Sequence, residues 1–221
     1  MSVAATPLEQ PAWLAATPEG FRETVGLTET ALADAETFRE MLNRTNSQMN
    51  LVGASTLESF WERHFLDSAQ LRWFAPCALT WADLGAGAGL PGLVLSILLK
   101  GKAGAKVHLV ESMAKRCRFL AEVAEALRLP VEIHNARAET LKLKVEVVTA
   151  RACAPLDRLL GFAQPYLARG ATGLFLKGAD LDSELAEARK LWRFAAAADV
   201  SLSDPRGRIL TITELARARR A

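Results

Sequence analysis

The sequence predicts an α/β fold, a mostly parallel and doubly wound sheet with a helical extension on its amino-terminal side. Five strand-like segments alternate with helix-like segments after residue 76, and two more strand-like segments close the chain. A glycine-rich turn follows the first of these strands, where such sheets commonly bind a nucleotide or nucleoside. The chain has 221 residues and is 50% hydrophobic, which is enough for one well-buried domain.

The first third of the chain is predicted to be helical. After an Ala- and Pro-rich lead-in over residues 1–20, apolar residues recur on one helical face over about residues 27–43. A polar turn is expected over residues 46–53. A second helix is expected from Ser55, because Ser55 and Glu58 have the spacing of a capping box, and it should end before Pro76. We expect residues 1–76 to form an extension packed on a main domain of residues 77–221.

Seven segments of the main domain have the composition of strands. They cover residues 80–84, 107–111, 131–134, 145–150, 173–177, 198–202 and 209–213. Helices are expected between them at residues 91–100, 112–129, 156–168 and 181–191. The last two strands flank the turn residues Asp204 to Gly207, so we expect a closing hairpin that adds antiparallel pairing to a seven-stranded sheet.

The glycine-rich turn is Asp83-Leu84-Gly85-Ala86-Gly87-Ala88-Gly89-Leu90-Pro91-Gly92. Its spacing formally satisfies the fingerprint of a nicotinamide or flavin dinucleotide site. Asp83 argues against that ligand, since a carboxylate beside the turn would repel a pyrophosphate. S-adenosylmethionine instead carries a sulfonium and an ammonium group, which a nearby carboxylate favours. The turn therefore favours S-adenosylmethionine, with an ordinary strand–turn–helix corner as the structural alternative.

Acidic residues after the next strands extend the expected cofactor site. Glu111 ends the second strand, where a carboxylate commonly accepts hydrogen bonds from ribose hydroxyls. Ala138 and Glu139 follow the third strand, where a loop passes the edge of an adenine ring. A carboxylate that caps the next helix, and a plain surface loop, are the alternatives for these two positions.

Several basic residues are candidates for contacts with the methyl acceptor. Arg151 ends the fourth strand and Lys177 ends the fifth, where either can clamp a phosphate or serve as a salt-bridge partner. Lys115, Arg116 and Arg118 fall in the first turns of a helix, where the helix macrodipole disfavours cations. Phosphates of a nucleic acid or bridges to nearby acids such as Glu111 and Glu122 can offset that cost, and both explanations remain open.

Several other functions are disfavoured. We expect no metal site, because no cluster of His, Cys, Asp and Glu has metal-ligand spacing, and His108 and His134 lie within strands. His64, Asp67 and Ser68 do not resemble a hydrolase triad, and His64 is expected to hold the helical extension near the site. Three scattered cysteines indicate a reducing cytoplasm, and no apolar run is long enough to span a membrane.

Taken together, these segments resemble the RsmG (GidB) family of bacterial ribosomal RNA methyltransferases. The resemblance is carried by Met49-Asn50-Leu51-Val52, Arg63-His64-Phe65-Leu66-Asp67-Ser68, Asp83 to Gly92, Lys115-Arg116-Cys117-Arg118-Phe119-Leu120, Arg137-Ala138-Glu139, Arg151-Ala152 and Leu176-Lys177-Gly178. Two positions depart from the family pattern. Glu111 stands where many members have Asp, and Leu93-Val94-Leu95 lacks a second Pro that is common there.

The resemblance implies a Rossmann-like class I fold that binds S-adenosylmethionine. It implies methyl transfer to N7 of a guanine, at position 527 of the 530 loop, in 16S ribosomal RNA or the small ribosomal subunit. Gly85, Leu90, Ala138, Glu139 and Arg151 would line the cofactor site. We expect a cytoplasmic monomer that needs no catalytic base. A non-catalytic RNA-binding module and a nicotinamide-dependent oxidoreductase are the alternatives.

Overall fold

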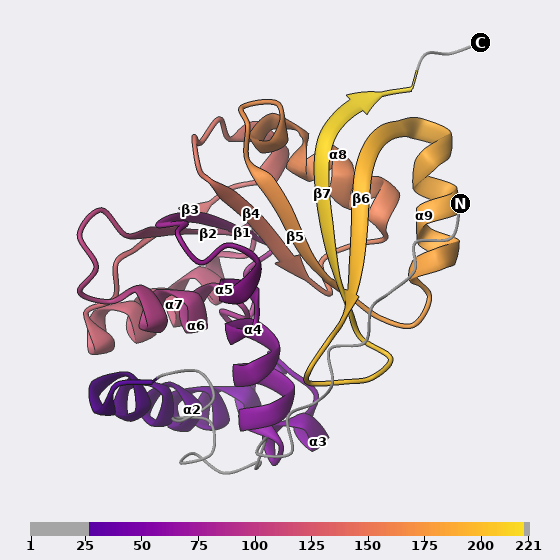
Figure 1. Ribbon diagram of the computed structural model, residues 1–221. Coiled ribbons are helices and arrows are strands. Elements are labelled where there is room, and N and C mark those ends of the chain that lie inside the picture. Colours follow the sequence, from indigo (N-terminus) through magenta and orange to yellow (C-terminus); the bar gives the residue numbers. More distant parts are fainter. Residues whose placement is uncertain (1–26, 219–221) are drawn as a thin grey trace.

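One sheet of seven strands organises the part of the chain that the computed structural model describes, residues 27–218 (Figure 1). The predicted lead-in over residues 1–20 lies outside the described residues. The strand order is β3-β2-β1-β4-β5-β7-β6. This order confirms the predicted mostly parallel, seven-stranded α/β fold.

Five parallel strands form the centre and one edge of the sheet. They are β1 (Thr80–Leu84), β2 (Lys106–Glu111), β3 (Val131–Asn135), β4 (Val147–Arg151) and β5 (Thr172–Lys177). β6 (Trp192–Val200) and β7 (Arg208–Arg217) form the predicted hairpin, and β7 lies antiparallel between β5 and β6. In the common dinucleotide-binding order the sixth strand lies directly beside the fifth and parallel to it, so this sheet departs from that order.

Helices cover both faces of the sheet (Figure 1). Two clusters of buried hydrophobic residues lie between these helices and the sheet. α6 (Gly92–Leu99) and α7 (Ala114–Leu127) pack on one face, with α2 (Glu29–Met49) against them. α8 (Leu156–Leu167) and α9 (Leu181–Leu191) pack on the other face. Because Phe38 and Leu42 of α2 are fully buried in the first cluster, the extension shares a core with the sheet.

The extension differs from its prediction in two places. α2 runs on to Met49, into the expected turn, because Asn46 is buried and its amide bonds both main-chain groups of Val52, at 2.8 and 3.1 Å. The capping box at Ser55 is wrong, since Gly53 is the N-cap of α3 and no side chain caps it. The loop that joins α2 to α3 is therefore held by one buried amide.

The second predicted helix is broken into short pieces. They are α3 (Ala54–Leu57), a π-helical segment η1 (Trp61–Leu66), α4 (Asp67–Ala69) and α5 (Leu71–Phe74). π-helical turns are rare and are often found at functional sites. Here the turn buries Phe65 and Leu66 in the core and places Arg63 and His64 at the carboxyl ends of the strands.

The strand at the far edge is longer than predicted. β6 begins at Trp192, directly after α9, whereas the sequence predicted a start at residue 198. The intervening run of alanines has high helix propensity, yet its pairing with β7 overrides that preference. Within residues 27–218, no helix is long and apolar enough to cross a bilayer.

Candidate active site at the carboxyl ends of the strands

The glycine-rich turn leaves β1 at Gly85 and folds over the end of β2. The N–H groups of Gly85 and Ala86 both donate to the carbonyl oxygen of Val110, at 2.8 and 3.0 Å. Gly85 has a φ of 69°, and a Cβ there would lie 2.7 Å from the Sγ of Cys153. Glycine is therefore required by both conformation and space, and the turn lies against the residues that follow β4.

Asp83 is buried beneath this turn. Its Oδ2 accepts a hydrogen bond from the N–H of Gly92 at 2.9 Å, which ties β1 to the start of α6. Its Oδ1 is buried and has no hydrogen-bond partner among the described residues. Burial raises the pKa of Asp83 to about 7, although the Gly92 N–H and the Arg151 guanidinium oppose the rise. A cation nearby would favour the ionised carboxylate.

Glu111 is the last residue of β2 and is 4% exposed. Its Oε2 accepts from the N–H of Gly87 at 3.1 Å, and its Oε1 accepts from the N–H of Met113 at 2.8 Å. Each carboxylate oxygen keeps a second lone pair that can accept a hydroxyl of a ligand. Glu111 therefore joins the glycine turn to the start of α7 and stays able to bind a ligand.

A cavity of about 600 Å³ beside Glu111 brings together four residues expected at the cofactor site. Gly85, Glu111, Ala138 and Glu139 line it. Tyr166 donates from its hydroxyl to the carbonyl oxygen of Ala138 at 3.0 Å, which holds this loop against α8. We call this space the smaller cavity.

Four other residues expected at the cofactor site do not line the smaller cavity: Arg151, described below, and three residues of the turn. Asp83 and Leu90 are buried under the turn, and Gly87 is held there by its bond to Glu111. Sequence reasoning missed Arg158 and Phe162, which do line the cavity. Their spacing of four residues on α8 places both on one helix face, but nothing in the sequence shows that this face meets the cavity.

A larger cavity of about 1000 Å³ shares Cys153 with the smaller one. Its walls come from the helical extension, the ends of β4 and β5, and the loop between β6 and β7. Arg151, expected at the cofactor site, lines this larger cavity and not the smaller one. Sequence reasoning did not assign Arg63, Arg206 and Arg208, which also line it.

Arg151 is held by the helical extension. Its guanidinium lies 3.2 Å from the Nδ1 of His64 and 3.2 Å from the Oδ2 of Asp67, and it donates to the carbonyl oxygen of Arg63 at 3.0 Å. Since a guanidinium only donates, Nδ1 of His64 accepts, and Nε2 carries the proton toward the Oγ1 of Thr56 at 2.9 Å. Three polar groups thus orient one arginine, and Thr56 orients the imidazole among them.

His64 stays neutral in this network. Burial, together with the nearby Arg151 charge, lowers its pKa to about 4. Ser68 donates from its hydroxyl to the main-chain oxygen of His64 at 2.6 Å, and so it does not pair with the imidazole ring. This geometry agrees with the rejection of a hydrolase triad and with the predicted role of His64 in holding the extension.

Lys177 also lines the larger cavity, but its charge is neutralised. Its Nζ forms an ion pair with Glu184 and donates to the carbonyl oxygen of Ala154 at 3.3 Å. The side chain is only 9% exposed. The geometry is that of the salt-bridge partner, the alternative considered for this residue.

The three basic residues of α7 differ in their surroundings. Arg116 lies 3.7 Å from Glu111 and so forms one of the expected bridges. Lys115 and Arg118 are exposed on the surface of the helix. α7 begins beside Glu111 and Ser112 of the smaller cavity, which places these cations at the edge of the candidate active site.

One group of potential metal ligands among the described residues was not signalled by spacing in the sequence. His108, Glu132 and His134 offer ligand atoms that all lie within 4.8 Å of one another. The sequence separation hides this cluster, because parallel pairing of β2 with β3 places residue 108 opposite residue 132. It lies apart from the two cavities.

Solved structures of methyltransferases share this architecture. The fold is similar to that of a putative O-methyltransferase from Klebsiella pneumoniae, with a TM-score of 0.59, 11% identity, and coverage of 93% of this chain and 99% of that chain. It is also similar to magnesium protoporphyrin IX methyltransferase from Synechocystis, with a TM-score of 0.52, 12% identity, and coverage of 80% and 97%. The fold class is therefore the Rossmann-like class I fold of S-adenosylmethionine-dependent methyltransferases.

The chain belongs to the GidB family, described as rRNA small subunit methyltransferase G, whose model matches residues 31–209. It is 62% identical over 200 residues to ribosomal RNA small subunit methyltransferase G of Caulobacter vibrioides, covering 90% of this chain and 93% of that one. It is 44% identical over 192 residues to the protein of the same name from Methylorubrum populi, covering 86% and 90%. The predicted family is confirmed, and with it a methyltransferase.

Proposed function

We propose that this chain transfers a methyl group from S-adenosylmethionine to N7 of a guanine in 16S ribosomal RNA, at position 527 of the 530 loop. We further propose that it acts as a cytoplasmic monomer. The observation that carries the proposal is a pair of cavities that share Cys153 at the carboxyl ends of the strands, in a chain of the GidB family. The smaller cavity would take the cofactor and the larger one the nucleotide to be methylated.

The residues of the smaller cavity fit S-adenosylmethionine. Its volume of about 600 Å³ lies within the range of small-molecule sites. Glu111 has lone pairs for ribose hydroxyls, and Ala138 and Glu139 offer a main-chain edge and a carboxylate for the adenine. Asp83, whose buried Oδ1 has no hydrogen-bond partner among the described residues, suits a cationic ligand held above the turn.

The chemistry requires positioning and no proton transfer before attack. The bound cofactor supplies an electrophilic methyl group on a sulfonium, and guanine N7 already carries a free lone pair. The protein therefore needs to hold N7 in line with the methyl–sulfur bond. Arg151 is suited to orient the base or its phosphate, because His64 and Asp67 fix its guanidinium at the wall of the larger cavity.

The surface around the larger cavity suits a polyanion. Arg63, Arg206 and Arg208 lie in its walls, and Lys115 and Arg118 lie on α7 near the smaller cavity. Phosphate contacts by such residues contribute binding energy that falls with salt concentration. We propose that they, with Arg116 and Lys177 in secondary roles, hold the RNA.

The cofactor assignment is tested by calorimetry with S-adenosylmethionine and NAD. The wild-type chain should bind S-adenosylmethionine and not NAD. Glu111→Gln should weaken this binding about tenfold or more, because a charge-assisted hydrogen bond contributes about 1.5–3 kcal/mol. Glu122→Gln, an exposed acid on α7, is the matched control and should bind as the wild type does. Equal affinity in both variants would refute the placement of the cofactor.

The acceptor assignment is tested by transfer of a labelled methyl group to small ribosomal subunits that lack the modification. Label at guanine N7, mapped by strand cleavage at the modified base, is the expected result. Cofactor binding without any transfer to the subunit or its naked RNA would favour the non-catalytic module instead.

The RNA-binding surface is tested by charge reversal. Lys115→Glu combined with Arg118→Glu should weaken RNA binding and reduce the slope of log affinity against log salt by about 2, one for each lost phosphate contact. Lys102→Glu is the matched control, since Lys102 is exposed in the loop before β2, at the opposite end of the strands. The same slope in the double variant and the control would show that Lys115 and Arg118 make no contact with RNA phosphates.

A further inference from the structure

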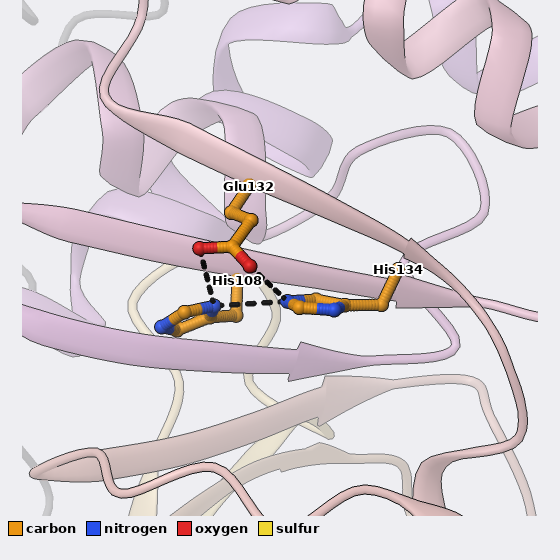
Figure 2. Close-up of side chains that lie close together, drawn as sticks. All are labelled: His108, Glu132 and His134. Atoms are coloured by element: carbon orange, nitrogen blue, oxygen red, sulfur yellow. Dashed lines mark hydrogen bonds and ion pairs between the residues drawn. The ribbon is translucent and has the colours of Figure 1, made fainter.

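A cluster of three potential metal ligands lies on one face of the sheet, at the strands β2 and β3 (Figure 2). His108 is the register partner of Glu132, and His134 lies two residues further along β3. Residues two apart on a strand point to the same face, so all three side chains project together. β3 is the edge strand, and the cluster sits at that edge.

The cluster reaches solvent through Glu132, and the connection from β3 to β4 beside it is short. Between these strands the structure has only the 3-10 turn η2 (Ala138–Thr140), and no helix there covers the cluster. The Glu132 side chain is 47% exposed, whereas those of His108 and His134 are 11% and 15% exposed. An ion could enter from the solvent beside Glu132 and keep water as a further ligand.

The distances are close to those of a metal site. Nδ1 of His108 lies 3.0 Å from Nε2 of His134, and these atoms lie 3.8 and 3.6 Å from the nearest carboxylate oxygens of Glu132 (Figure 2). Ligands about 2.0–2.1 Å from a tetrahedral zinc ion are roughly 3.3–3.4 Å apart. Small side-chain rotations would therefore bring all three onto one ion.

The chemistry of the three groups is that of a zinc site. A neutral imidazole can carry its proton on either nitrogen, so both facing nitrogens can become free to bind a metal. Two imidazoles and one carboxylate are a ligand set that zinc uses in sites with an open coordination position. We propose that His108, Glu132 and His134 bind a divalent transition-metal ion of the zinc class.

One neighbour opposes the ion. Nζ of Lys106 lies 3.1 Å from Oε2 of Glu132 and competes for that oxygen. The Lys106 side chain is 53% exposed, so it can turn into solvent when the metal binds. Removal of the Lys106 charge should therefore strengthen metal binding. If the two histidines only bond each other and bind no metal, its removal should have no effect on Zn²⁺ binding.

The test uses the whole chain after treatment with a chelator. Calorimetry with Zn²⁺ should show one ion per chain with a micromolar or lower dissociation constant, and saturating Zn²⁺ should raise Tm by several degrees. Co²⁺ should give the visible absorption of a nitrogen and oxygen site without a thiolate charge-transfer band. The absence of saturable Zn²⁺ binding, or a thiolate band, would overturn the proposal.

Variants then locate the ion. His134→Asn and Glu132→Gln, both on the edge strand, should each weaken Zn²⁺ binding about tenfold or more, and Lys106→Gln should tighten it a few-fold. His64→Gln and Cys77→Ser are controls with one other histidine and an exposed thiol, and their Zn²⁺ affinity should equal that of the wild type. Unchanged affinity in both edge-strand variants would overturn the proposal, even if a His108 variant failed to fold.

Discussion

Asp83 gives the sharpest prediction about stability, because its carboxyl group is buried with one oxygen unpartnered. The unfolded chain releases this proton near pH 3.8, whereas burial raises the folded pKa to about 7. The folded state thus holds the proton more tightly, and the free energy of unfolding falls as pH rises through this window. The stabilising contribution is full below pH 3.8 and is lost above pH 7.

The size of the effect follows from the shift. Each pKa unit corresponds to about 1.4 kcal/mol, so a shift of about three units gives about 4 kcal/mol above pH 7. About 1.5 kcal/mol of this loss is already present at pH 5 by the same relation. The wild-type chain should therefore lose about 2–3 kcal/mol from this one group between pH 5 and pH 8.

The substitution Asp83→Asn isolates the contribution of this carboxyl group to the pH dependence of stability. The asparagine oxygen can still accept from Gly92, while the side chain no longer ionises. Urea unfolding of both proteins without ligand, at pH 5 and at pH 8, gives two free-energy differences in which all other titrating groups cancel. The variant should show a pH dependence smaller by about 2–3 kcal/mol. Parallel pH profiles for the two proteins would refute the reasoning.

Four further substitutions test single positions. Because the pKa of His64 is lowered from 6.5 to about 4, stability should fall as pH drops through that window, and His64→Gln should remove about 2–3 kcal/mol of this dependence in acid urea titrations. Gly92→Ala should cost about 2–3 kcal/mol, because its Cβ would lie 2.3 Å from a leucine methyl. Gly161→Ala on α8, which meets only ordinary packing at 3.7 Å, should instead stabilise by about 0.5–1 kcal/mol in the same urea assay. Asn46→Ala should cost about 2 kcal/mol in thermal or urea unfolding, because it leaves both main-chain groups of Val52 without their partner; an unchanged midpoint would show that water replaces the amide.

The fold was predictable because its signals are local. Alternation of strand-like and helix-like segments set the sheet, and α9 was placed at its observed bounds, residues 181–191. The failures lie where tertiary contacts override local preference. The alanines of β6 join a strand through pairing with β7, and α2 continues past Asn43 because a polar residue, Asn46, is buried.

The candidate site was predictable only in part. Glu111 ends one strand, and Ala138 and Glu139 follow another. Parallel strands bring their carboxyl ends to one edge, so the meeting of these residues in the smaller cavity could be expected. The placement of Arg151 could not, because it depends on His64 and Asp67 in a π-helical turn that the sequence does not signal. The cluster of His108, Glu132 and His134 could not be predicted either, because it depends on the register between β2 and β3.

The larger cavity has a consequence for the order in which the protein matures during synthesis. The smaller cavity is lined by residues 85–162, but the larger one also needs residues 201–208 from the end of the chain. Ser203 closes it with a hydrogen bond of 2.6 Å to Asp67, across 136 residues of sequence. A nascent chain can thus contain every residue of the smaller cavity while the larger cavity still lacks one wall. Competence for the nucleotide would arise only after the β6–β7 hairpin has folded against the helical extension.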